Sequence, residues 1–493
     1  MRAKTINYDI LFRAAIFMAG FLIAGCSAGG QNQQKPNIIL IMLDDVSPDV
    51  YGCYGEPGAA NTPVIDQLAR EGVMFETCYA SSLCAPTRAM IMTGRYGTTT
   101  GVLHNNMWLG NTRGDVYKDN HAFGKLLKDA GYATAIAGKW HAGAQMPYEP
   151  EVGFDEYCLW EGGAEFAKAE GSENYQCAWR GDGQWSRYWH PAIVKNHQYL
   201  ETKPDDFGPD IFCEFILDFM GRKVKEDQPF LAYWPSVAPH GCREGITTTP
   251  HRGPTGVMTR SETEDEKKAR WIALNEYIDH LVGQVVNKVE ELGIKENTYV
   301  ILLSDNGTAV TAKSRGVERG VHVMNICWGG QVKQRGATAE LTDFSDIGPT
   351  LCEIAGIEMP EASFDGVSLK SFLNGEKDTH RDWIYGYIGT TRLIRTKEYM
   401  IEAINPMLGS PEGRFYLAGN DRFGHTYKKI NDHPDYLKDR AELQVILDAL
   451  PDVVGDNPWW KTGKGMKVWE GYSEEKAVNK HLYNHKDYKY YEE

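Results

Sequence analysis

The 493-residue sequence lacks several features that define common functional classes. Its ten cysteines form no CxxC pair, so their spacing suggests neither a zinc site nor a redox motif. Basic residues are the minority, 52 against 67 acidic ones, and the formal charge is −15. This balance argues against nucleic acid as a partner, because a nucleic-acid binder needs a basic face. Any anionic substrate has to be bound by a local group of cations.

The sequence also has no internal repeat and no low-complexity block, and the apolar run Ala14–Ala24 is too short to span a bilayer. This run follows three basic residues and ends in Ile-Ala-Gly-Cys26, which resembles an export signal with a bacterial lipobox. We expect a signal peptide over 1–25, lipid attachment at Cys26 and a flexible tether over 26–35. A plain secretory peptide cut nearby is the alternative. Both place the protein outside the cytoplasm; the lipobox predicts a periplasmic or cell-surface lipoprotein that contacts the membrane only through its lipid.

From residue 36 onward, short apolar runs alternate with amphipathic stretches, as in α/β proteins. Four runs are apolar on both faces and predict buried strands at Asn37–Leu43, Ala133–Ala137, Phe230–Trp234 and Tyr299–Leu303. Helical spacing predicts helices at Thr62–Arg70, His121–Ala130, Lys267–Leu292 and Thr342–Ala355. The region Glu156–Lys203 is dense in Gly, Trp and Tyr, which indicates an insertion or long surface loop; ordinary packing and a binding role both remain open.

A change in composition predicts a domain boundary near residue 378. Residues 374–380 are polar and turn-rich, as in a linker, and the β-leaning stretch Trp383–Ile401 follows them. We therefore expect a larger domain over 36–378 and a C-terminal subdomain over 379–493.

Polar residues follow each of the four predicted strands. They are Asp44 and Asp45 after the first strand, Lys139 and His141 after the second, His240 after the third, and Asp305 and Asn306 after the fourth. The carboxyl ends of parallel strands share one edge of a sheet, where ligands bind, so we expect these side chains to lie together. Each one alone could equally be a helix cap or a turn residue.

The acidic members of this set, with the amide of Asn306, offer only oxygen ligands. Such ligands favour calcium or magnesium over zinc. Three crowded carboxylates would raise one another's pKa unless a cation neutralised them. The residues therefore predict a metal site that also supplies positive charge to an anionic substrate.

The segment Ser81–Gly94 carries the most specific motif. Pro86 fits the first turn of a helix, which places Cys84 at or just before a helix N-terminus that favours an anion. The pattern Cys84-x-Pro-x-Arg88, followed by Gly-Arg, resembles the signature of the formylglycine-dependent sulfatases of the alkaline-phosphatase-like superfamily.

This resemblance extends from about Pro36 to about Ile401. It implies an α/β/α sandwich around a large mixed sheet, and a small C-terminal α+β domain with an antiparallel sheet. It implies that a maturation enzyme oxidises Cys84 to formylglycine, and that one calcium ion is held by Asp44, Asp45, Cys84, Asp305 and Asn306. The catalytic residues that it implies are Cys84, Arg88, Lys139, His141, His240 and Lys313.

The chemistry gives a reason for the modification. A serine that attacked sulfur would keep a stable sulfate ester, whereas a hydrated aldehyde has a second hydroxyl whose deprotonation expels sulfate. In this scheme Arg88 and the cation hold the hydrate, Lys139 and His240 neutralise the sulfate oxygens, and His141 takes the proton. Either His240 or a lysine further along could be the general acid.

The match is weakest at Lys313. The family usually has a lysine five residues before a Glu-Gly-Gly-x-Arg-Val-Pro segment. Lys313 precedes Glu318 at that offset, but three later residues of the segment differ here. Arg315 and Arg319 are therefore alternatives to Lys313.

The sequence thus predicts a sulfuric ester hydrolase that acts on a sulfated polysaccharide or oligosaccharide, since such polymers are the common sulfate esters outside cells. One alternative is a phosphomonoesterase, phosphodiesterase or phosphonate hydrolase of the same superfamily, although the extra ligands for two zinc ions are missing. Another is a lipoprotein that binds sulfated glycans without catalysis, which the intact set of site residues argues against.

Two arginines in Gly389–Lys397 are further candidates for substrate binding. The cations of this stretch alternate roughly with apolar residues, as on a strand with one solvent-exposed face. Arg392 or Arg395 could pair with a second sulfate or a uronic carboxylate of a polymeric substrate. Solvated surface charge is the alternative interpretation.

Overall fold

The computed structural model describes the central part of the chain. The described residues are 34–105, 107–108, 116–118, 120–143, 145–160, 179–180, 184–185, 187–241, 249–250, 263–308, 312–359, 363–405, 410–419 and 423–451. The predicted signal peptide, Cys26 and most of the tether lie outside these ranges, as do residues 452–493. Within them, no helix combines the length and the apolar character needed to cross a membrane.

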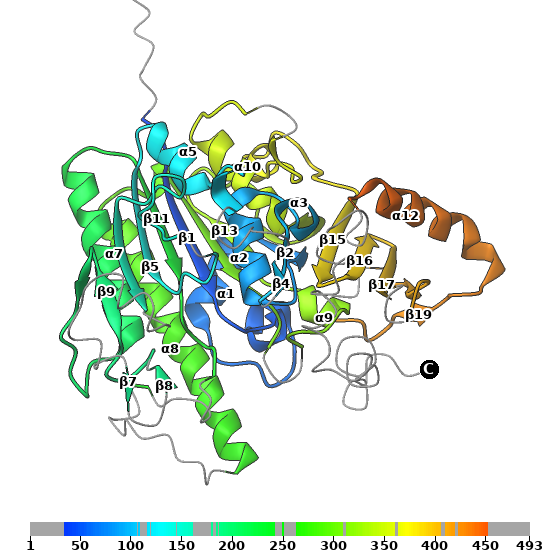
Figure 1. Ribbon diagram of the computed structural model, residues 1–493, viewed down its shortest axis with the longest axis horizontal. Coiled ribbons are helices and arrows are strands. Elements are labelled where there is room, and N and C mark those ends of the chain that lie inside the picture. The colour runs from blue at the N-terminus through cyan, green and yellow to red at the C-terminus, as the bar shows by residue number, and fades with distance from the viewer. Residues whose placement is uncertain are drawn as a thin grey trace, which may run out of the picture. The chain divides into compact units, whose positions relative to one another are not determined.

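A mixed sheet of ten strands forms the centre of the fold (Figure 1). Across the sheet, the strands follow one another as β10 (Gln198–Tyr199), β9 (Ile193–Lys195), β6 (Glu156–Trp160), β5 (Ala133–Gly138), β11 (Phe230–Pro235), β1 (Asn37–Leu43), β12 (Thr298–Ser304), β13 (Asn325–Trp328), β2 (Val73–Tyr79) and β14 (Gly336–Asp343). The four predicted strands become β1, β5, β11 and β12, which are neighbours and parallel. Strand β13 runs antiparallel to β12 and β2, which makes the sheet mixed.

Helices cover both faces of this sheet. Side chains of β1 alternate between two hydrophobic cores: Ile38, Leu40 and Met42 belong to one and Ile39, Ile41 and Leu43 to the other. The first core also contains residues of α2 (Cys84–Thr93), α5 (Phe123–Asp129) and α10 (Ile347–Ile354). The second contains residues of α1 (Pro63–Glu71), α7 (Gly208–Lys225) and α8 (Glu264–Glu291). The expected α/β/α sandwich is confirmed.

A second, antiparallel sheet follows in the chain. Its five strands are β15 (Trp383–Ile388), β16 (Thr391–Thr396), β17 (Tyr399–Ile404), β18 (Arg414–Leu417) and β19 (Lys428–Lys429). Helix α12 (Leu437–Ala449) packs on it, because Leu443 and Leu447 share a core with Ile394 and Ile401. Shorter elements of the fold are α3 (Gly97–Thr100), β3 (Val102–His104), β4 (Met107–Trp108), β7 (Trp179–Arg180), β8 (Gln184–Trp185), α9 (Glu318–Val321) and α11 (Lys370–Leu373). The small C-terminal sheet is as expected; the boundary near residue 378 stays a prediction.

Two expectations about local structure need correction. The helix predicted at Thr342–Ala355 starts only at Ile347, because its first residues end β14 and form a 3-10 turn. There the carboxylate of Asp343 accepts the backbone N–H of Ser345, which favours a cap over a continuous helix. The region Glu156–Lys203 is more than a loop, because β6, β9 and β10 add three strands to the large sheet.

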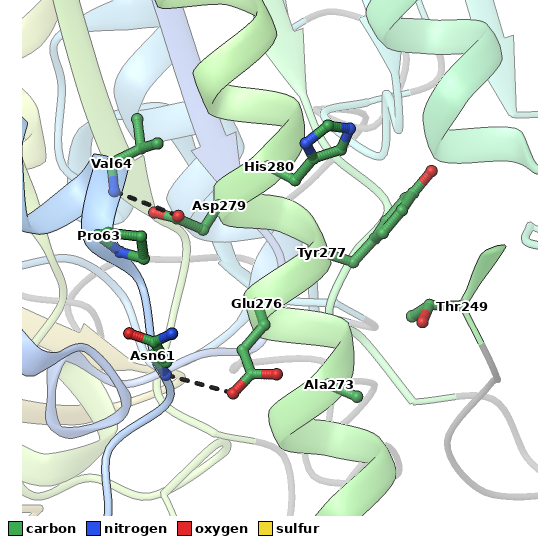
Figure 2. Close-up of a pocket in the computed structure, with 9 residues that line it drawn as sticks. All are labelled: Asn61, Pro63, Val64, Thr249, Ala273, Glu276, Tyr277, Asp279 and His280. Atoms are coloured by element: carbon green, nitrogen blue, oxygen red, sulfur yellow. Dashed lines mark hydrogen bonds between the residues drawn. The ribbon is translucent and has the colours of Figure 1, made fainter. Parts of the chain in front are cut away.

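Helix α1 is capped by a residue from another helix. Thr62 makes no side-chain cap, and the carboxylate of Asp279 on α8 accepts the N–H groups of Val64 and Ile65 at 3.2 and 2.7 Å. Figure 2 shows Val64 and Asp279 among the residues that line a surface pocket between the two helices. Burial raises the pKa of Asp279 to about 6. The contact therefore links α1 to α8, and its contribution to stability depends on pH through the ionisation of Asp279.

We expect Asp279→Ala to lower the free energy of unfolding at neutral pH by about 1 kcal/mol, because two N–H groups lose their acceptor. The pKa of Asp279 is higher in the folded state than its usual value of 3.8, so the folded state binds this proton more tightly than the unfolded chain. Wild-type stability relative to Asp279→Asn should therefore fall as the pH rises from about 4 to 6. Melting temperatures of both proteins across this range test the trend, and a constant difference would contradict it.

Candidate functional site

The carboxyl ends of the central strands bring the predicted site residues together. Asp44 follows β1, and its N–H donates to the carbonyl of Ala238 beyond β11 at 3.0 Å. Asp305 follows β12, and its N–H donates to the carbonyl of Leu43 at 2.9 Å. The N–H of Asp45 donates to Oδ1 of Asp305 at 2.9 Å. Backbone pairing of neighbouring strands thus sets the positions of all three carboxylates.

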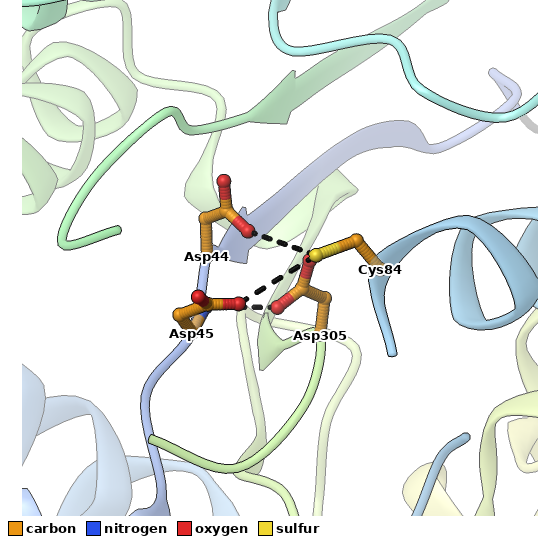
Figure 3. Close-up of side chains that lie close together, drawn as sticks. All are labelled: Asp44, Asp45, Cys84 and Asp305. Carbon is orange, nitrogen blue, oxygen red and sulfur yellow. Dashed lines mark hydrogen bonds between the residues drawn. The ribbon is translucent and has the colours of Figure 1, made fainter. Parts of the chain in front are cut away.

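Three carboxylates surround one sulfur atom at this edge (Figure 3). Ligand atoms of Asp44, Asp45, Cys84 and Asp305 all lie within 4.8 Å of one another, and all four residues are buried. Sγ of Cys84 lies 3.6 Å from Oδ1 of Asp44 and 3.6 Å from Oδ1 of Asp45.

Cys84 is the first residue of α2, as the proline in its motif predicts. The next N–H of the helix, that of Ala85, donates to Oδ1 of Asn105 at 3.0 Å. Burial raises the pKa of the Cys84 thiol to about 12, although Lys139 and Lys313 act to lower it. An unmodified Cys84 would therefore be protonated at neutral pH and a poor nucleophile.

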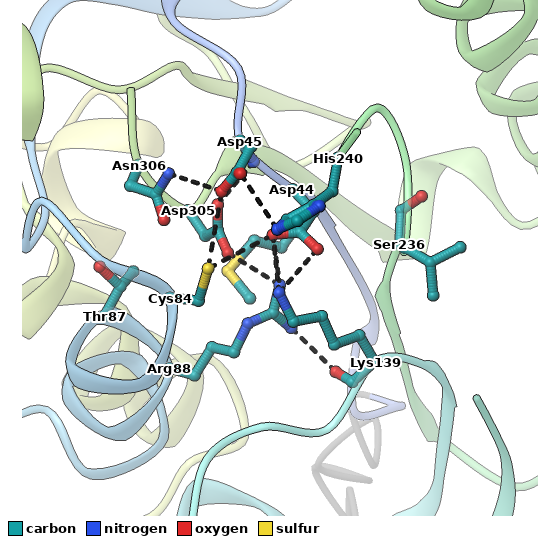
Figure 4. A network of polar contacts seen from close by, with 12 residues as sticks. Asp44, Asp45, Cys84, Thr87, Arg88, Lys139, Ser236, His240, Asp305 and Asn306 are labelled. Carbon is teal, nitrogen blue, oxygen red and sulfur yellow. Dashed lines mark hydrogen bonds and ion pairs between the residues drawn. The ribbon is translucent and has the colours of Figure 1, made fainter. Parts of the chain in front are cut away.

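Arg88 and Lys139 offset the buried carboxylates on one side (Figure 4). Nη2 of Arg88 lies 2.8 Å from Oδ2 of Asp305, and Nη1 donates to the carbonyl of Lys139 at 2.8 Å. Nζ of Lys139 lies 2.9 and 2.7 Å from the two carboxylate oxygens of Asp44. Arg88 therefore orients both a carboxylate and the segment that carries Lys139.

A glycine sets the path of the chain before Lys139. Gly138 has φ 124°, and a Cβ there would lie 2.0 Å from the carbonyl oxygen of Pro235. The N–H of Lys139 donates to that same oxygen at 2.7 Å. Only glycine allows this approach, which turns Lys139 into the site.

Lys313 and His240 lie on another side of the cluster. Nζ of Lys313 is 2.5 Å from Oδ1 of Asp45, 3.2 Å from Sγ of Cys84 and 3.3 Å from Nε2 of His240. The same imidazole nitrogen lies 3.2 Å from Oδ2 of Asp45. Burial lowers the pKa of His240 to about 4, so the ring is neutral near pH 7.

The sequence leaves three cations open for one catalytic role, and they are Lys313, Arg315 and Arg319. Of these, Lys313 contacts the cluster of carboxylates. Arg319 instead pairs with Asp49 at 2.8 Å. Arg315 donates its backbone N–H to Oγ of Ser82 at 2.9 Å. The geometry favours Lys313, and its catalytic role stays a prediction.

Left-handed backbone conformations occur at three residues of the site that are not glycine. The φ values are 65° at Asp45, 46° at His141 and 65° at Ser314, which follows Lys313. Such conformations are unfavourable for side-chain-bearing residues and are kept where the surrounding structure requires them. The His141 side chain is exposed, yet the surrounding protein and the nearby charges of Lys139 and Arg88 hold its pKa well below its usual value.

The carboxylates differ in their titration. Burial alone would raise the pKa of Asp44, but Lys139, His240 and Arg88 together bring it well below its usual range. Burial and the neighbouring Asp44 raise the pKa of Asp305 to about 7, because Arg88 and Lys139 offset them only in part. Without a further cation, Asp305 is thus partly protonated at neutral pH.

The amide of Asn306 has an unused acceptor beside these carboxylates. Its Nδ2 donates to Oδ1 of Asp45 at 2.8 Å and to the carbonyl of Gly307 at 3.0 Å. Its buried Oδ1 has no hydrogen-bond partner among the described residues. An orphaned amide oxygen next to three carboxylates is the donor set that a hard cation such as calcium prefers.

The two candidate substrate-binding arginines, Arg392 and Arg395, both lie on β16 of the second sheet. Arg395 is buried, and its guanidinium contacts the carboxylate of Glu318, the hydroxyl of Tyr427 and the carbonyl of Gly419. This placement favours a structural role over a substrate contact. Arg392 is half-buried on β16, and its contact with substrate stays a prediction.

One cation near the site is not among the predicted residues. Nη1 of Arg187 lies 3.9 Å from Oδ2 of Asp44, and its guanidinium lies over the ring of Trp160, 4.1 Å from the centroid. The signal that could have located Trp160 is its position at the end of the apolar run Tyr157-Cys-Leu, which forms β6. Arg187 lies in the irregular region after it and has no motif of its own.

Comparisons with known proteins show the family of this chain. A family model described as Sulfatase matches residues 36–357. N-acetylgalactosamine-6-sulfatase of Canis lupus familiaris is 29% identical over 406 residues, which cover 76% of this chain and 72% of that protein. Arylsulfatase A of Homo sapiens is 29% identical over 393 residues, with 74% and 73% covered.

Solved structures share the fold. Ps i-CgsB, which is also described in complex with k-i-k-neocarrahexaose, superimposes with a TM-score of 0.66 at 23% identity, covering 88% of this chain and 97% of that one. BT4656, in complex with its substrate D-glucosamine-2-N,6-O-disulfate, gives a TM-score of 0.62 at 20% identity, covering 88% and 98%. Since the family model matches more than half of the residues, the chain belongs to the sulfatase family and is a sulfuric ester hydrolase.

Proposed function

We propose that this sulfatase acts on sulfated carbohydrates, with a formylglycine derived from Cys84 as nucleophile and one bound calcium ion. The observation that carries the proposal is the position of Cys84. It begins α2 inside a buried group of three carboxylates and is surrounded by Arg88, Lys139 and Lys313.

The protonated state of the thiol supports the modification. With a pKa raised to about 12, the Cys84 thiol has little nucleophilic character at neutral pH. An aldehyde at this position, once hydrated, supplies a hydroxyl for attack on sulfur and a second hydroxyl for release of sulfate. A formylglycine-generating enzyme is therefore a required partner before the protein folds around the buried side chain.

Five residues are suited to hold the calcium ion. They are Asp44, Asp45, Asp305, Asn306 and the modified residue 84, and the orphaned Oδ1 of Asn306 supports the assignment. When bound, the ion supplies positive charge that lowers the pKa of a nearby hydroxyl and attracts the sulfate group. It would also keep Asp305 ionised at neutral pH.

The remaining residues have roles that follow from their positions. Lys139 and Lys313 lie on either side of the cluster and can hold sulfate oxygens as negative charge develops on them. Arg88 orients Asp305 and the Lys139 segment through its two hydrogen bonds. Lys313 and His240 are the candidates for the proton given to the leaving alcohol. Lys313 already carries that proton, whereas the His240 ring is neutral near pH 7 and has to take one up first. His141 at the exposed edge is the candidate base.

The carbohydrate substrate is supported by the names of similar proteins. One relative is an N-acetylgalactosamine-6-sulfatase, and two structural neighbours are described in complexes with an oligosaccharide or a sulfated sugar. The motif at Cys26 adds the proposal that the enzyme is exported and lipid-anchored outside the cytoplasm, where sulfated polysaccharides occur.

Cys84→Ala should abolish sulfate ester hydrolysis, because the nucleophile is lost. Peptide mass spectrometry of wild-type protein made with a maturation enzyme should find residue 84 as formylglycine. Cys352→Ala, which changes a buried cysteine on α10, is the matched control and should keep most of the activity. An active enzyme whose Cys84 is entirely a thiol would refute the proposed nucleophile.

Calcium affinity should weaken as the pH falls below about 7, because the proton on Asp305 competes with the ion. For one competing proton, the dissociation constant rises by about tenfold per pH unit. Calorimetric titration of chelator-treated protein from pH 5 to 8 measures this slope. Asp305→Ala should lose the affinity, whereas Asp129→Asn, on the exposed face of α5, should not. Unchanged binding in Asp305→Ala would overturn the ligand assignment.

Arg395→Ala should lower the melting temperature by several degrees, because Glu318 would remain buried without its cation. The same change should reduce the rates with an aryl sulfate and with a sulfated oligosaccharide by the same factor. A selective loss on the oligosaccharide at unchanged stability would instead support a direct contact of Arg395 with substrate.

A further inference from the structure

Arg187 and Trp160 form an aromatic and cationic pair at one side of the site. Trp160 ends β6, which pairs with β5 so that Leu159 lies opposite Gly138. Trp160 therefore lies beside the chain that leads to Lys139. The guanidinium of Arg187 stacks over its ring at 4.1 Å, a distance at which the cation is attracted to the ring face.

The backbone around Arg187 is firmly positioned. The hydroxyl of Tyr188 donates to the carbonyl of His240 at 2.7 Å, and the N–H of Gly208 donates to the carbonyl of Tyr188 at 2.8 Å. A Cβ at Gly208 would lie 2.2 Å from the carbonyl oxygen of Arg187, so the start of α7 approaches this segment closely. Arg187 is therefore held against the loop that carries His240.

The guanidinium itself is incompletely satisfied. The side chain is 14% exposed, and Nη1 approaches Asp44 only to 3.9 Å, which is too long for a hydrogen bond. Its buried Nε and Nη1 atoms find no hydrogen-bond acceptor among the described residues. Buried donors of this kind are normally paired, and a ligand that brings an acceptor would complete them.

We propose that Arg187, stacked on Trp160, binds a second anionic group of the saccharide, separate from the sulfate that is cleaved. The inference deepens the proposed function and rests on it. The ligand chemistry is an oxyanion, either a further sulfate or a carboxylate, because the planar guanidinium matches both.

The geometry separates this group from the reacting sulfate. Sγ of Cys84 contacts Oδ1 of Asp44, whereas Nη1 of Arg187 lies nearest to Oδ2 of the same carboxylate. Lys139 reaches both oxygens and lies between the two sides. Arg187 and Sγ of Cys84 thus approach Asp44 at different carboxylate oxygens, so the guanidinium does not share the contact that Cys84 makes.

The test compares binding of two sugars that differ by one charge. The first pair of probes is D-glucosamine-2-N,6-O-disulfate and N-acetyl-D-glucosamine-6-O-sulfate, whose amide nitrogen carries no charge. In the second pair, a sulfated disaccharide with a uronic carboxylate is compared with its carboxyl-reduced form. Dissociation constants are measured by calorimetry in the calcium-loaded Cys84→Ser background, which keeps an oxygen ligand at residue 84 but lacks the second hydroxyl that releases sulfate, so the result does not depend on turnover. Failure of wild-type protein to hydrolyse any sulfate ester would refute the proposed function separately.

Within each pair, the preference is the ratio of the dissociation constants of the two probes. In Arg187→Gln, this ratio should fall about tenfold for at least one pair, because one charge-assisted contact to the additional anionic group is lost. Which pair responds tells a sulfate from a carboxylate. Arg187→Lys should recover only part of the preference, because an ammonium group lacks the paired N–H groups of the planar guanidinium. Trp160→Leu should reduce the preference, because the guanidinium loses the ring on which it stacks. Arg222→Gln is the matched control, since Arg222 also stacks over a ring, that of Phe219, but pairs with Glu156 at the other end of β6.

Two results would overturn the proposal. One is an unchanged preference for both pairs in a folded Arg187→Gln protein. The other is an equal loss of affinity for both members of each pair, which would mean that Arg187 contacts the cleaved sulfate itself. If Arg187→Gln does not fold, the same two outcomes are read from Trp160→Leu and Arg187→Lys.

Discussion

The burial of three carboxylates beside one sulfur atom is the constraint on which the rest of the site depends. Asp44, Asp45 and Asp305 are almost completely shielded from water, and such a group of like charges is stable only if cations lie close to it. Arg88, Lys139 and Lys313 meet this need through direct contacts. The raised pKa of Asp305 indicates that these side chains neutralise the negative charge of the carboxylates only in part. A bound metal ion would neutralise the remainder.

This arrangement explains why the site lies where the parallel strands end. Each strand supplies one or two polar residues at the point where its apolar run stops, and the hydrogen bonds between neighbouring strands fix their spacing. The helix that begins at Cys84 then directs its N-terminus toward the same edge. The second sheet contributes through Arg395, whose contact with Glu318 anchors the short helix α9 just after the Lys313 segment.

The parts of the fold that could be predicted are those whose signal is local. The strands β1, β5, β11 and β12 are continuous apolar runs, and their burial on both faces can be seen from composition alone. The start of α10 could not be predicted, because the capping contacts of Asp343 and Asp346 compete with a helix that the apolar spacing favours. The antiparallel direction of β13 likewise depends on its pairing with β12 and with β2, of which β2 lies far away in the chain.

The sequence by itself determined the chemical identity of the site: a motif cysteine before a helix, polar residues after four apolar runs, and oxygen ligands suited to a hard cation. Covalent order along the chain carries this information, because each signal spans only a few residues. Tertiary structure alone decided that Lys313 contacts the cluster, that Arg395 is buried by Glu318, and that Arg187 lies beside Asp44. These outcomes depend on distances between segments separated by tens to hundreds of residues, which only the packing of the two sheets and their helices fixes.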